Sequence, residues 1–408
     1  MPPEIIANVF IEWTMSKWSA AAVARQICRY FKAITDSTPR VWSKLFISYA
    51  SHATAGDVRV WLKRAKAVPK EINLETGNVS IIEAVLESVK DATSLIYRIT
   101  FLRVIPPSQD ELIRLPICLP RLRHLHLGNF MGAHSIFEHY NSPTDAHFPC
   151  LTTLSMGSTD LSNFPIMPGL FPVMRRLVLK GVLGPILDLI QVCSGSLEEL
   201  RVVFLTDDHQ FSPHGRICLP NLKVLVVRLA VGIVSNLDAP TLRLIHADLD
   251  EMDGSTRPFP SVVEWATCQD HSRFQEVDIA LHLKNMPQLR HLMLSRDLGT
   301  LNACFASLCD MPTLCPDLQY IEVVEFMESW EEYPEFRLDS DAKKAMEGSV
   351  AQRAERVSGF TLRFVDLEDQ WERLTQYHDD GYVCLFSFMR RCQSYHASRN
   401  TITHSKGQ

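Results

Sequence analysis

The chain has little glycine and lacks the cysteine spacings that are typical of metal sites and disulfide scaffolds. It contains 17 glycines among 408 residues, and no two of its 11 cysteines form a C-x-x-C pair. The G-x-S-x-G and H-E-x-x-H motifs of hydrolases are also absent from the sequence. We therefore expect a protein of a reducing compartment that is not an enzyme and has no catalytic, cofactor-binding or metal-binding residues.

Long apolar runs and a secretory leader are missing as well. The longest nearly apolar run, Val224 to Val234, is interrupted by Arg228 and is too short to span a bilayer. The N-terminal sequence MPPEIIANVF has no basic segment and no small-residue cleavage site. These features predict a cytoplasmic and/or nuclear protein with no membrane partner. The net charge of −6 does not favour nucleic acid as a partner.

Nine short segments share one apolar pattern. In each of them an anchor residue opens Φ-x-x-Φ-x-Φ, where Φ is an apolar residue. A proline stands two residues before the anchor in eight segments, and Gly195 takes its place before Leu197 in the ninth. The eight prolines and their anchors are Pro120 and Leu122, Pro149 and Leu151, Pro172 and Met174, Pro220 and Leu222, Pro240 and Leu242, Pro260 and Val262, Pro287 and Leu289, and Pro316 and Leu318.

The spacing of these anchors predicts a solenoid with one strand per repeat. Successive anchors are 20 to 29 residues apart, which is the period of such arrays. Similar segments opening at Ile96 and Val357 extend the predicted array to residues 96–366, with about 10–11 repeats. The prolines suit the start of a strand, because proline lacks the N–H that ladder bonding requires. We expect an α/β fold with a curved parallel sheet, and such open faces usually bind partners.

Helical patterns stand before this array. Residues 1–48 predict three short helices, with apolar stripes at Ile5, Ile6, Val9 and Phe10 and at Val23, Ile27, Phe31 and Ile34. Thr38-Pro39 predicts the start of the third helix, which would carry Trp42, Leu45 and Phe46. Residues 49–95 predict connecting helices, one of them beginning at the Ser80-x-x-Glu83 capping box. Residues 367–408 predict a C-terminal tail.

Residues 1–48 resemble an F-box. The resemblance rests on three elements in order: Pro2-Pro3-Glu4-Ile5-Ile6-x-x-Val9-Phe10, then Ile27-Cys28-Arg29-Tyr30-Phe31-Lys32-x-Ile34, then Ser37-Thr38-Pro39-Arg40-Val41-Trp42-Ser43. The segment Trp61-Leu62-x-Arg64-Ala65 is similar to one that follows the F-box in many fungal members. The later array resembles the leucine-rich repeats that those proteins carry. The chain is therefore similar to fungal, basidiomycete-type F-box proteins with C-terminal leucine-rich repeats.

This resemblance implies a function. It predicts a substrate-recognition subunit of a Skp–cullin–F-box ubiquitin ligase, in which the F-box binds the Skp-type adaptor and the repeats bind an unknown protein substrate. The adaptor-binding or F-box-core residues that it implies are Pro2, Pro3, Ile5, Ile6, Val9, Ile27, Phe31 and Trp42. The alternative is a leucine-rich-repeat scaffold or interaction protein that has a vestigial F-box and acts outside the ubiquitin system. Several of the eight residues could instead simply close a helical core.

Alternation along the predicted strands indicates where a substrate would bind. Successive side chains of a strand point to opposite faces of the sheet. If Leu125 and Leu127 face the core, His124 and His126 lie on the other face, and the equivalent positions of the other repeats follow in the same way. The resulting candidates for a substrate face are His124, His126, Arg176, Arg201, Arg228, His246, His291 and Tyr320. The pair His124-x-His126 would also suit a metal, but the sequence shows no third ligand nearby. Any one of these residues could equally be an ordinary solvated side chain.

Overall fold

The structure is a computed structural model. It describes residues 1–16, 19–48, 51–76, 78–87, 92–98, 120–128, 148–157, 161, 166, 168–203, 216–228, 230, 232–247, 252, 258–267, 279–295, 298–311, 313–325, 346–348, 351 and 360–366. The chain forms two compact units. Unit 1 comprises residues 1–289 and 314–317, and unit 2 comprises residues 290–313 and 318–408.

The fold is α/β, with 13 described strands in a parallel arrangement. Ten of them lie in unit 1, in the order β1 (Lys44–Ile47), β2 (Lys70–Leu74), β3 (Ala92–Arg98), β4 (His124–Gly128), β5 (Thr153–Gly157), β6 (Arg176–Lys180), β7 (Glu199–Val203), β9 (Val224–Arg228), β11 (Leu244–His246) and β12 (Glu264–Ala266). A small parallel pair, β8 (Ile217–Cys218) and β10 (Leu237–Asp238), also belongs to unit 1. Unit 2 contributes β13 (His291–Ser295), β14 (Tyr320–Glu325) and β15 (Thr361–Asp366).

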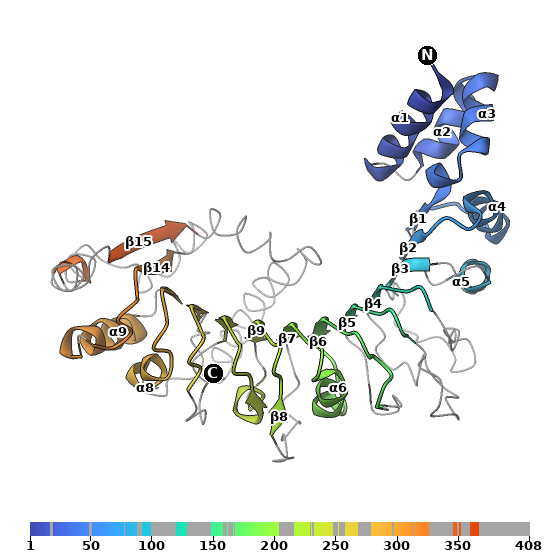
Figure 1. The fold of residues 1–408 in the computed structure, drawn as a ribbon. Helices are drawn as coiled ribbons and strands as arrows, with labels where there is room; N and C mark the ends of the chain where they lie inside the picture. Colours follow the sequence, from blue (N-terminus) through green and yellow to red (C-terminus); the bar gives the residue numbers. More distant parts are fainter. Residues whose placement is uncertain are drawn as a thin grey trace, which may run out of the picture. The chain divides into compact units, whose positions relative to one another are not determined.

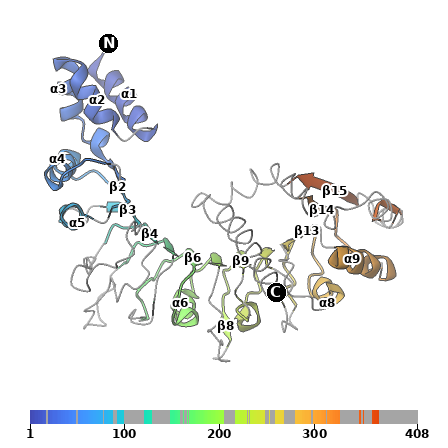
Figure 2. The same cartoon turned by 180° about the vertical axis from the view of Figure 1, so that it is seen from behind.

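Helices lie at one end and on one side of the sheet of unit 1. The N-terminal helices are α1 (Pro3–Ser16), α2 (Ala20–Ile27), α3 (Arg29–Ser37) and the 3₁₀ helix η1 (Pro39–Trp42). Within the repeats lie α4 (Ala55–Ala65), α5 (Val79–Leu86), α6 (Ile186–Cys193), η4 (Val234–Asn236) and α8 (Ile279–Lys284), whereas α9 (Leu298–Asp310) belongs to unit 2. Both views show α4, α5 and α6 on the same side of the sheet (Figures 1 and 2).

The core of the array is built from the repeated apolar pattern. All nine anchors are no more than 1% exposed, and a strand begins two residues after each of them. The next apolar position forms one continuous buried row across unit 1: Leu45, Ile72, Leu95, Leu125, Leu154, Leu177, Leu200, Leu225, Ile245 and Trp265. Because burying one such side chain contributes about 1.5–3 kcal/mol, stacking of neighbours stabilises repeats that could not fold alone. The predicted solenoid-like repetition is confirmed.

Each proline belongs to a tight turn that ends at the anchor. The Leu151 N–H donates to the Phe148 carbonyl oxygen at 3.2 Å, and the Leu222 N–H donates to the Leu219 carbonyl oxygen at 3.2 Å. Proline is therefore the second residue of a four-residue turn, where its fixed φ is favourable. The residue before the proline is also buried, as Phe148, Leu219 and Met286 illustrate. The sequence pattern did not include this additional row of core residues.

The sheet begins earlier than the sequence pattern predicted. β1 and β2 pair in parallel with one another, and β2 pairs with β3, so residues 44–74 already contribute two strands. The predicted register of the next strand was wrong: β3 begins at Ala92, and Leu95 is aligned with Leu125. Ile96 is aligned with His126 instead and therefore faces the other side of the sheet. In unit 2, β15 aligns Leu362 with Ile321, which is two residues later along the strand than predicted.

Two helical predictions also need correction. The stripe from Val23 to Ile34 is not one helix, because Cys28 has an extended backbone, with φ −160° and ψ 167°, between α2 and α3. The predicted third helix is the short η1, after which the chain enters β1. Furthermore, α5 is capped by Asn78, whose side chain accepts a hydrogen bond from the Ile81 N–H, rather than by Ser80. The predicted tail at 367–408 lies outside the described residues.

Candidate functional site

The N-terminal helices form a small module around a compact core. Phe10 of α1 is 4% exposed, and its ring meets the Phe31 ring edge-on, with centroids 5.2 Å apart. Ala21 and Ala24 of α2 are fully buried, and such small residues let neighbouring helices approach closely. The extended Cys28 separates α2 from α3, and its sulfur accepts a hydrogen bond from the Phe31 N–H at 3.4 Å. α1, α2, α3 and η1 are together called the helical module below.

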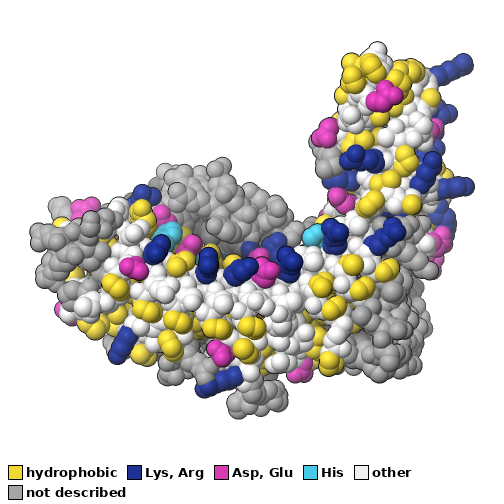
Figure 3. Space-filling view, viewed as in Figure 1, with side chains coloured by type: hydrophobic (Ala, Val, Ile, Leu, Met, Phe, Trp, Pro, Cys, Tyr) yellow, Lys and Arg dark blue, Asp and Glu magenta, His cyan; other side chains and the backbone are white. Residues whose placement is uncertain are grey.

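Exposed apolar side chains gather on α1 and at the junction of α2 and α3. Ile5 is 50% exposed, Val9 is 54% exposed and Ile27 is 55% exposed. The Tyr30 hydroxyl donates to the Met1 carbonyl oxygen at 3.3 Å, which joins the start of α3 to the start of α1. Figure 3 shows apolar side chains in yellow at this end of the molecule. We define the docking patch as the exposed residues Met1, Pro2, Pro3, Ile5, Val9, Val23, Ile27 and Tyr30.

The eight residues predicted to contact an adaptor or close the core fall into two groups. Five of them lie in the docking patch: Pro2, Pro3, Ile5, Val9 and Ile27. The other three are less accessible. Ile6 is 7% exposed and Trp42 is 1% exposed, whereas Phe31 is half-buried against Phe10. Ile6 and Trp42 therefore act as core residues in the free chain.

Trp42 connects the helical module with the first strands of the array. Its Nε1–H donates to the Thr35 carbonyl oxygen of α3 at 2.8 Å. Its ring meets the Trp61 ring of α4 edge-on at 4.7 Å, and the Trp61 Nε1–H donates to the Lys44 carbonyl oxygen of β1 at 3.1 Å. Two buried indoles thus join α3, α4 and β1 through paired polar groups, which is the arrangement that buried Trp favours.

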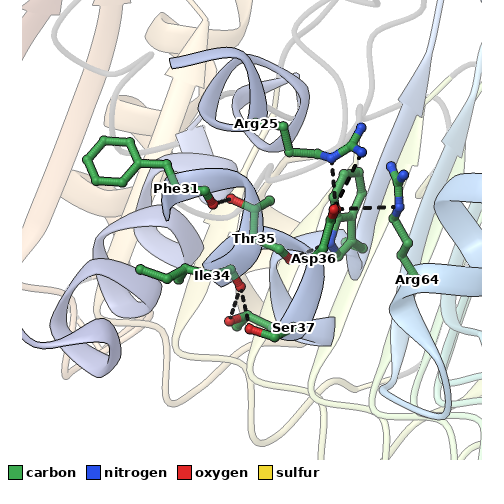
Figure 4. A network of polar contacts seen from close by, with 9 residues as sticks. Arg25, Phe31, Ile34, Thr35, Asp36, Ser37 and Arg64 are labelled. Carbon is green, nitrogen blue, oxygen red and sulfur yellow. Dashed lines mark hydrogen bonds and ion pairs between the residues drawn. The ribbon is translucent and has the colours of Figure 1, made fainter. Parts of the chain in front are cut away.

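A charged cluster of Arg25, Asp36 and Arg64 lies beside the Trp42 ring. Figure 4 shows the two arginine side chains beside Asp36. The Asp36 carboxylate lies 2.7 Å from the Arg25 Nε and 3.7 Å from the Arg64 Nε. The Arg64 guanidinium also lies 4.6 Å from the Trp42 ring centroid, within cation–π range. Burial is the main cause that lowers the pKa of Arg64, and the charge of Arg25 adds to it. Asp36 offsets this repulsion, so the cluster fixes α2 and α3 against α4.

On the sheet face that was predicted to bind a substrate, several candidate side chains contact neighbouring side chains. His124 is exposed, but the His126 Nδ1 lies 2.8 Å from the Ser155 hydroxyl. Arg176 lies 3.3 Å from Glu199, to which Arg201 is also bonded, and Arg201 is only 6% exposed. Between these residues lie buried apolar side chains such as Val178, so this face of unit 1 is only partly exposed.

The remaining sheet-face candidates are in polar surroundings. The His246 Nε2 lies 3.9 Å from Glu264, and Arg228 is half-buried at the end of β9. In unit 2, the His291 Nε2 lies 3.0 Å from Glu322, whose side chain is 3% exposed. Tyr320 is 38% exposed, with the Arg363 guanidinium 5.4 Å from its ring centroid. Within unit 1 the candidates are distributed over β4, β6, β7, β9 and β11 instead of gathering at one place.

Sequence reasoning missed a row of charged residues that immediately precede the strands. Arg123, Arg175, Lys223 and Arg243 hold this position before β4, β6, β9 and β11, and all four are exposed. They belong to no motif, because the apolar pattern leaves this position free. The signal in the sequence is that each of them directly follows an anchor residue.

Within the described part of the chain, no group of three or more His, Cys, Asp or Glu residues is arranged to hold a metal ion. The helices found there are too short or too polar for any to cross a bilayer. In comparisons with models of known protein families and with curated proteins, the chain matches none.

Proposed function

We propose that the chain is a substrate-recognition subunit of a Skp–cullin–F-box ubiquitin ligase. In this proposal the helical module binds the Skp-type adaptor and the repeat array binds a protein substrate. The observation that carries the proposal is the docking patch, because it exposes five of the eight residues that the F-box resemblance implies. The expected cytoplasmic and/or nuclear location belongs to the same proposal.

The energetics of the docking patch support a protein partner. Ile5 and Val9 are one helical turn apart on α1, and both are about half exposed. Large apolar side chains that gather in this way mark interaction sites in soluble proteins. Covering each exposed half would contribute on the order of 1 kcal/mol, so several together would supply much of a specific association.

The junction around Trp42 supports the second half of the proposal. A subunit that presents a substrate needs a fixed orientation between its adaptor-binding helices and its substrate-binding repeats. The edge-on rings of Trp42 and Trp61 and the Arg64–Asp36 ion pair connect the helical module with α4. Within the module, Arg25 pairs with the same Asp36. Such preorganisation reduces the entropic cost of assembling a ternary complex.

The alternative function is a repeat scaffold whose helical module has lost adaptor binding. Burial of Trp42 and Ile6 is equally compatible with that role, because both residues close the module core. The two functions differ in one respect, which is whether a Skp-type adaptor co-purifies with the full chain.

The test is a pull-down of co-expressed Skp-type adaptor with the full chain. The double variant Ile5→Asp/Val9→Asp places two charges in the docking patch without touching the core. A change at Ile6 would be less informative, because this side chain is 7% exposed and its replacement would destabilise the module. The matched control is Val60→Asp on α4, which alters an apolar residue that is 46% exposed in the same unit.

We expect the double variant to weaken adaptor binding by at least about 100-fold, as is usual when two central contacts are lost, and Val60→Asp to change it little. Circular dichroism melting curves of all three proteins should coincide. Undiminished capture of the adaptor by the double variant would contradict the proposed docking patch. Failure of the unaltered chain to capture adaptor would favour the scaffold function.

A further inference from the structure

Four exposed cations occupy the same structural position in four repeats of unit 1. Arg123, Arg175, Lys223 and Arg243 each stand one residue before a strand, at the edge of the sheet where the strands begin. The Arg175 side chain is 69% exposed and that of Lys223 is 57% exposed. Figure 3 shows Lys and Arg side chains in dark blue in a row along this part of the sheet. We call these four residues the basic edge.

The backbone holds each of these cations in place. Every carbonyl oxygen of the basic edge accepts two N–H hydrogen bonds from the next strand in the sheet. For example, the Arg123 carbonyl oxygen accepts from Thr152 at 2.9 Å and Thr153 at 3.0 Å, and a bond at 3.0 Å from the Thr152 hydroxyl adds to them. The Arg243 carbonyl oxygen accepts from Val263 at 2.8 Å and Glu264 at 3.1 Å. The basic edge therefore presents its charges from a rigid support, which reduces the cost of ordering them on binding.

The basic edge carries an excess of positive charge. In the repeats between Arg123 and Arg243, Glu198 is the acid at the equivalent position, and it lies 2.7 Å from Lys223 and 3.8 Å from Arg175. The hydrogen bond from Lys223 is the main cause that lowers the pKa of Glu198. In the described part of the chain, Arg123 and Arg243 have no acidic partner. On the sheet face, by contrast, Arg176 and Arg201 both contact Glu199.

The spacing of the cations fits an extended polypeptide. Neighbouring strands lie about 4.8 Å apart, so the five strand spacings from β4 to β11 extend about 24 Å, the length of roughly seven extended residues. Carboxylates match the planar fork of arginine, which binds them through paired hydrogen bonds. A row one cation wide on a chain of net charge −6 is poorly suited to the dense charge of nucleic acid.

We propose that the basic edge binds an extended acidic segment of the substrate protein. The identity of that protein as a substrate rests on the proposed function, but binding of the acidic segment does not require the adaptor. The substrate would thus be selected by carboxylates spaced along an exposed strand-like segment. Glu198 acts as an internal competitor that weakens this interaction by pairing with Lys223 and Arg175.

The test measures binding of a fluorescent peptide to the purified full chain by anisotropy. The probe is a peptide of about ten residues that alternates glutamate and serine, long enough to cover the basic edge. A matched peptide with glutamine in place of glutamate measures any contribution that does not depend on charge. We expect the acidic peptide to bind at least about fivefold more tightly at low salt, with the difference shrinking as salt screens the charges.

Three variants make the test specific. Arg175→Glu/Arg243→Glu should weaken binding of the acidic peptide by about tenfold, because two favourable charges become repulsive. Glu198→Gln should strengthen it by about twofold to fivefold by freeing Lys223 and Arg175. The control, Lys63→Glu/Lys284→Glu, reverses two exposed cations on α4 and α8 and should change binding less than about twofold.

Equal binding of the two peptides, or no loss in Arg175→Glu/Arg243→Glu, would overturn the proposal. Preference for a single-stranded oligonucleotide of equal length over the acidic peptide would also overturn it, in favour of nucleic acid. Adaptor capture distinguishes failure of the basic-edge proposal from failure of the proposed function. A chain that binds the acidic peptide but no adaptor retains the basic edge as a binding site, whereas a chain that captures adaptor but not the peptide retains only the ligase role.

Discussion

Replacement of Trp42 by alanine should destabilise the helical module and the first repeats together. Trp42 is 1% exposed, and its ring meets the Trp61 ring edge-on, with centroids 4.7 Å apart. Removal of a buried Trp side chain typically costs about 3–5 kcal/mol, because apolar contacts are lost and a cavity remains. The Thr35 carbonyl oxygen also loses its hydrogen bond from the Trp42 Nε1–H. We therefore expect a loss of about 4 kcal/mol in the free energy of unfolding of this part of unit 1.

Urea unfolding, followed by far-ultraviolet circular dichroism and hydrogen exchange, measures this loss. With a denaturant dependence of about 2 kcal/mol per molar urea, the first transition should move down by about 2 M. Amides of α1–α4, β1 and β2 should lose protection together, because Trp42 and Trp61 join α3, α4 and β1. The helices α1 and α2 pack against α3, and β2 pairs with β1.

The control variant is Trp42→Phe, which keeps a ring against Trp61 but cannot donate to Thr35. It should cost only about 1–2 kcal/mol. The reasoning would be refuted if Trp42→Ala moved the transition by less than about 0.5 M urea. It would also be refuted if α1–α3 lost protection while β1 and β2 kept theirs.

Two further predictions concern single side chains. The Thr54–Asp57 capping box of α4 lowers the pKa of Asp57, mainly through the hydrogen bond with the Thr54 side chain, so its stabilisation is full above the unfolded pKa of about 4 and is lost as the pH falls below that value. Melting temperatures of the unaltered chain and Asp57→Asn should accordingly differ at pH 7 and converge near pH 3, and a constant difference would contradict this account. Burial raises the pKa of the Cys193 thiol to about 12, so alkylation at pH 8, followed by peptide mass spectrometry, should modify the exposed Cys28, Cys150 and Cys218 well before it. Equal rates at Cys193 would show that α6 opens readily.

The sequence pattern predicted the nine anchored strands because each of them needs a buried residue at three fixed positions. The same logic failed where two periodicities fit the same residues. Helical spacing fits Trp42, Leu45 and Phe46. The repeat pattern fits Trp42, Leu45 and Ile47, and the structure has a strand there, with Leu45 and Ile47 buried. Pro69 occupies the anchor position before β2, so the apolar pattern did not predict this strand.

The candidate sites were less predictable than the core because they depend on contacts between distant residues. The apolar stripe of Val23, Ile27, Phe31 and Ile34 continues through Cys28 at helical spacing, so the break between α2 and α3 was invisible. That break leaves Val23 and Ile27 exposed and buries Ile34. The basic edge likewise depends on register, which aligns residues 20 or more positions apart.

The most direct measurement of the central claim is hydrogen exchange of the full chain with and without a purified Skp-type adaptor. The account predicts that the adaptor slows exchange in α1 and around Ile27 to Tyr30, and leaves β4–β9 unchanged. Protection confined to the sheet, or no protection anywhere at adaptor concentrations that saturate known F-box proteins, would contradict it.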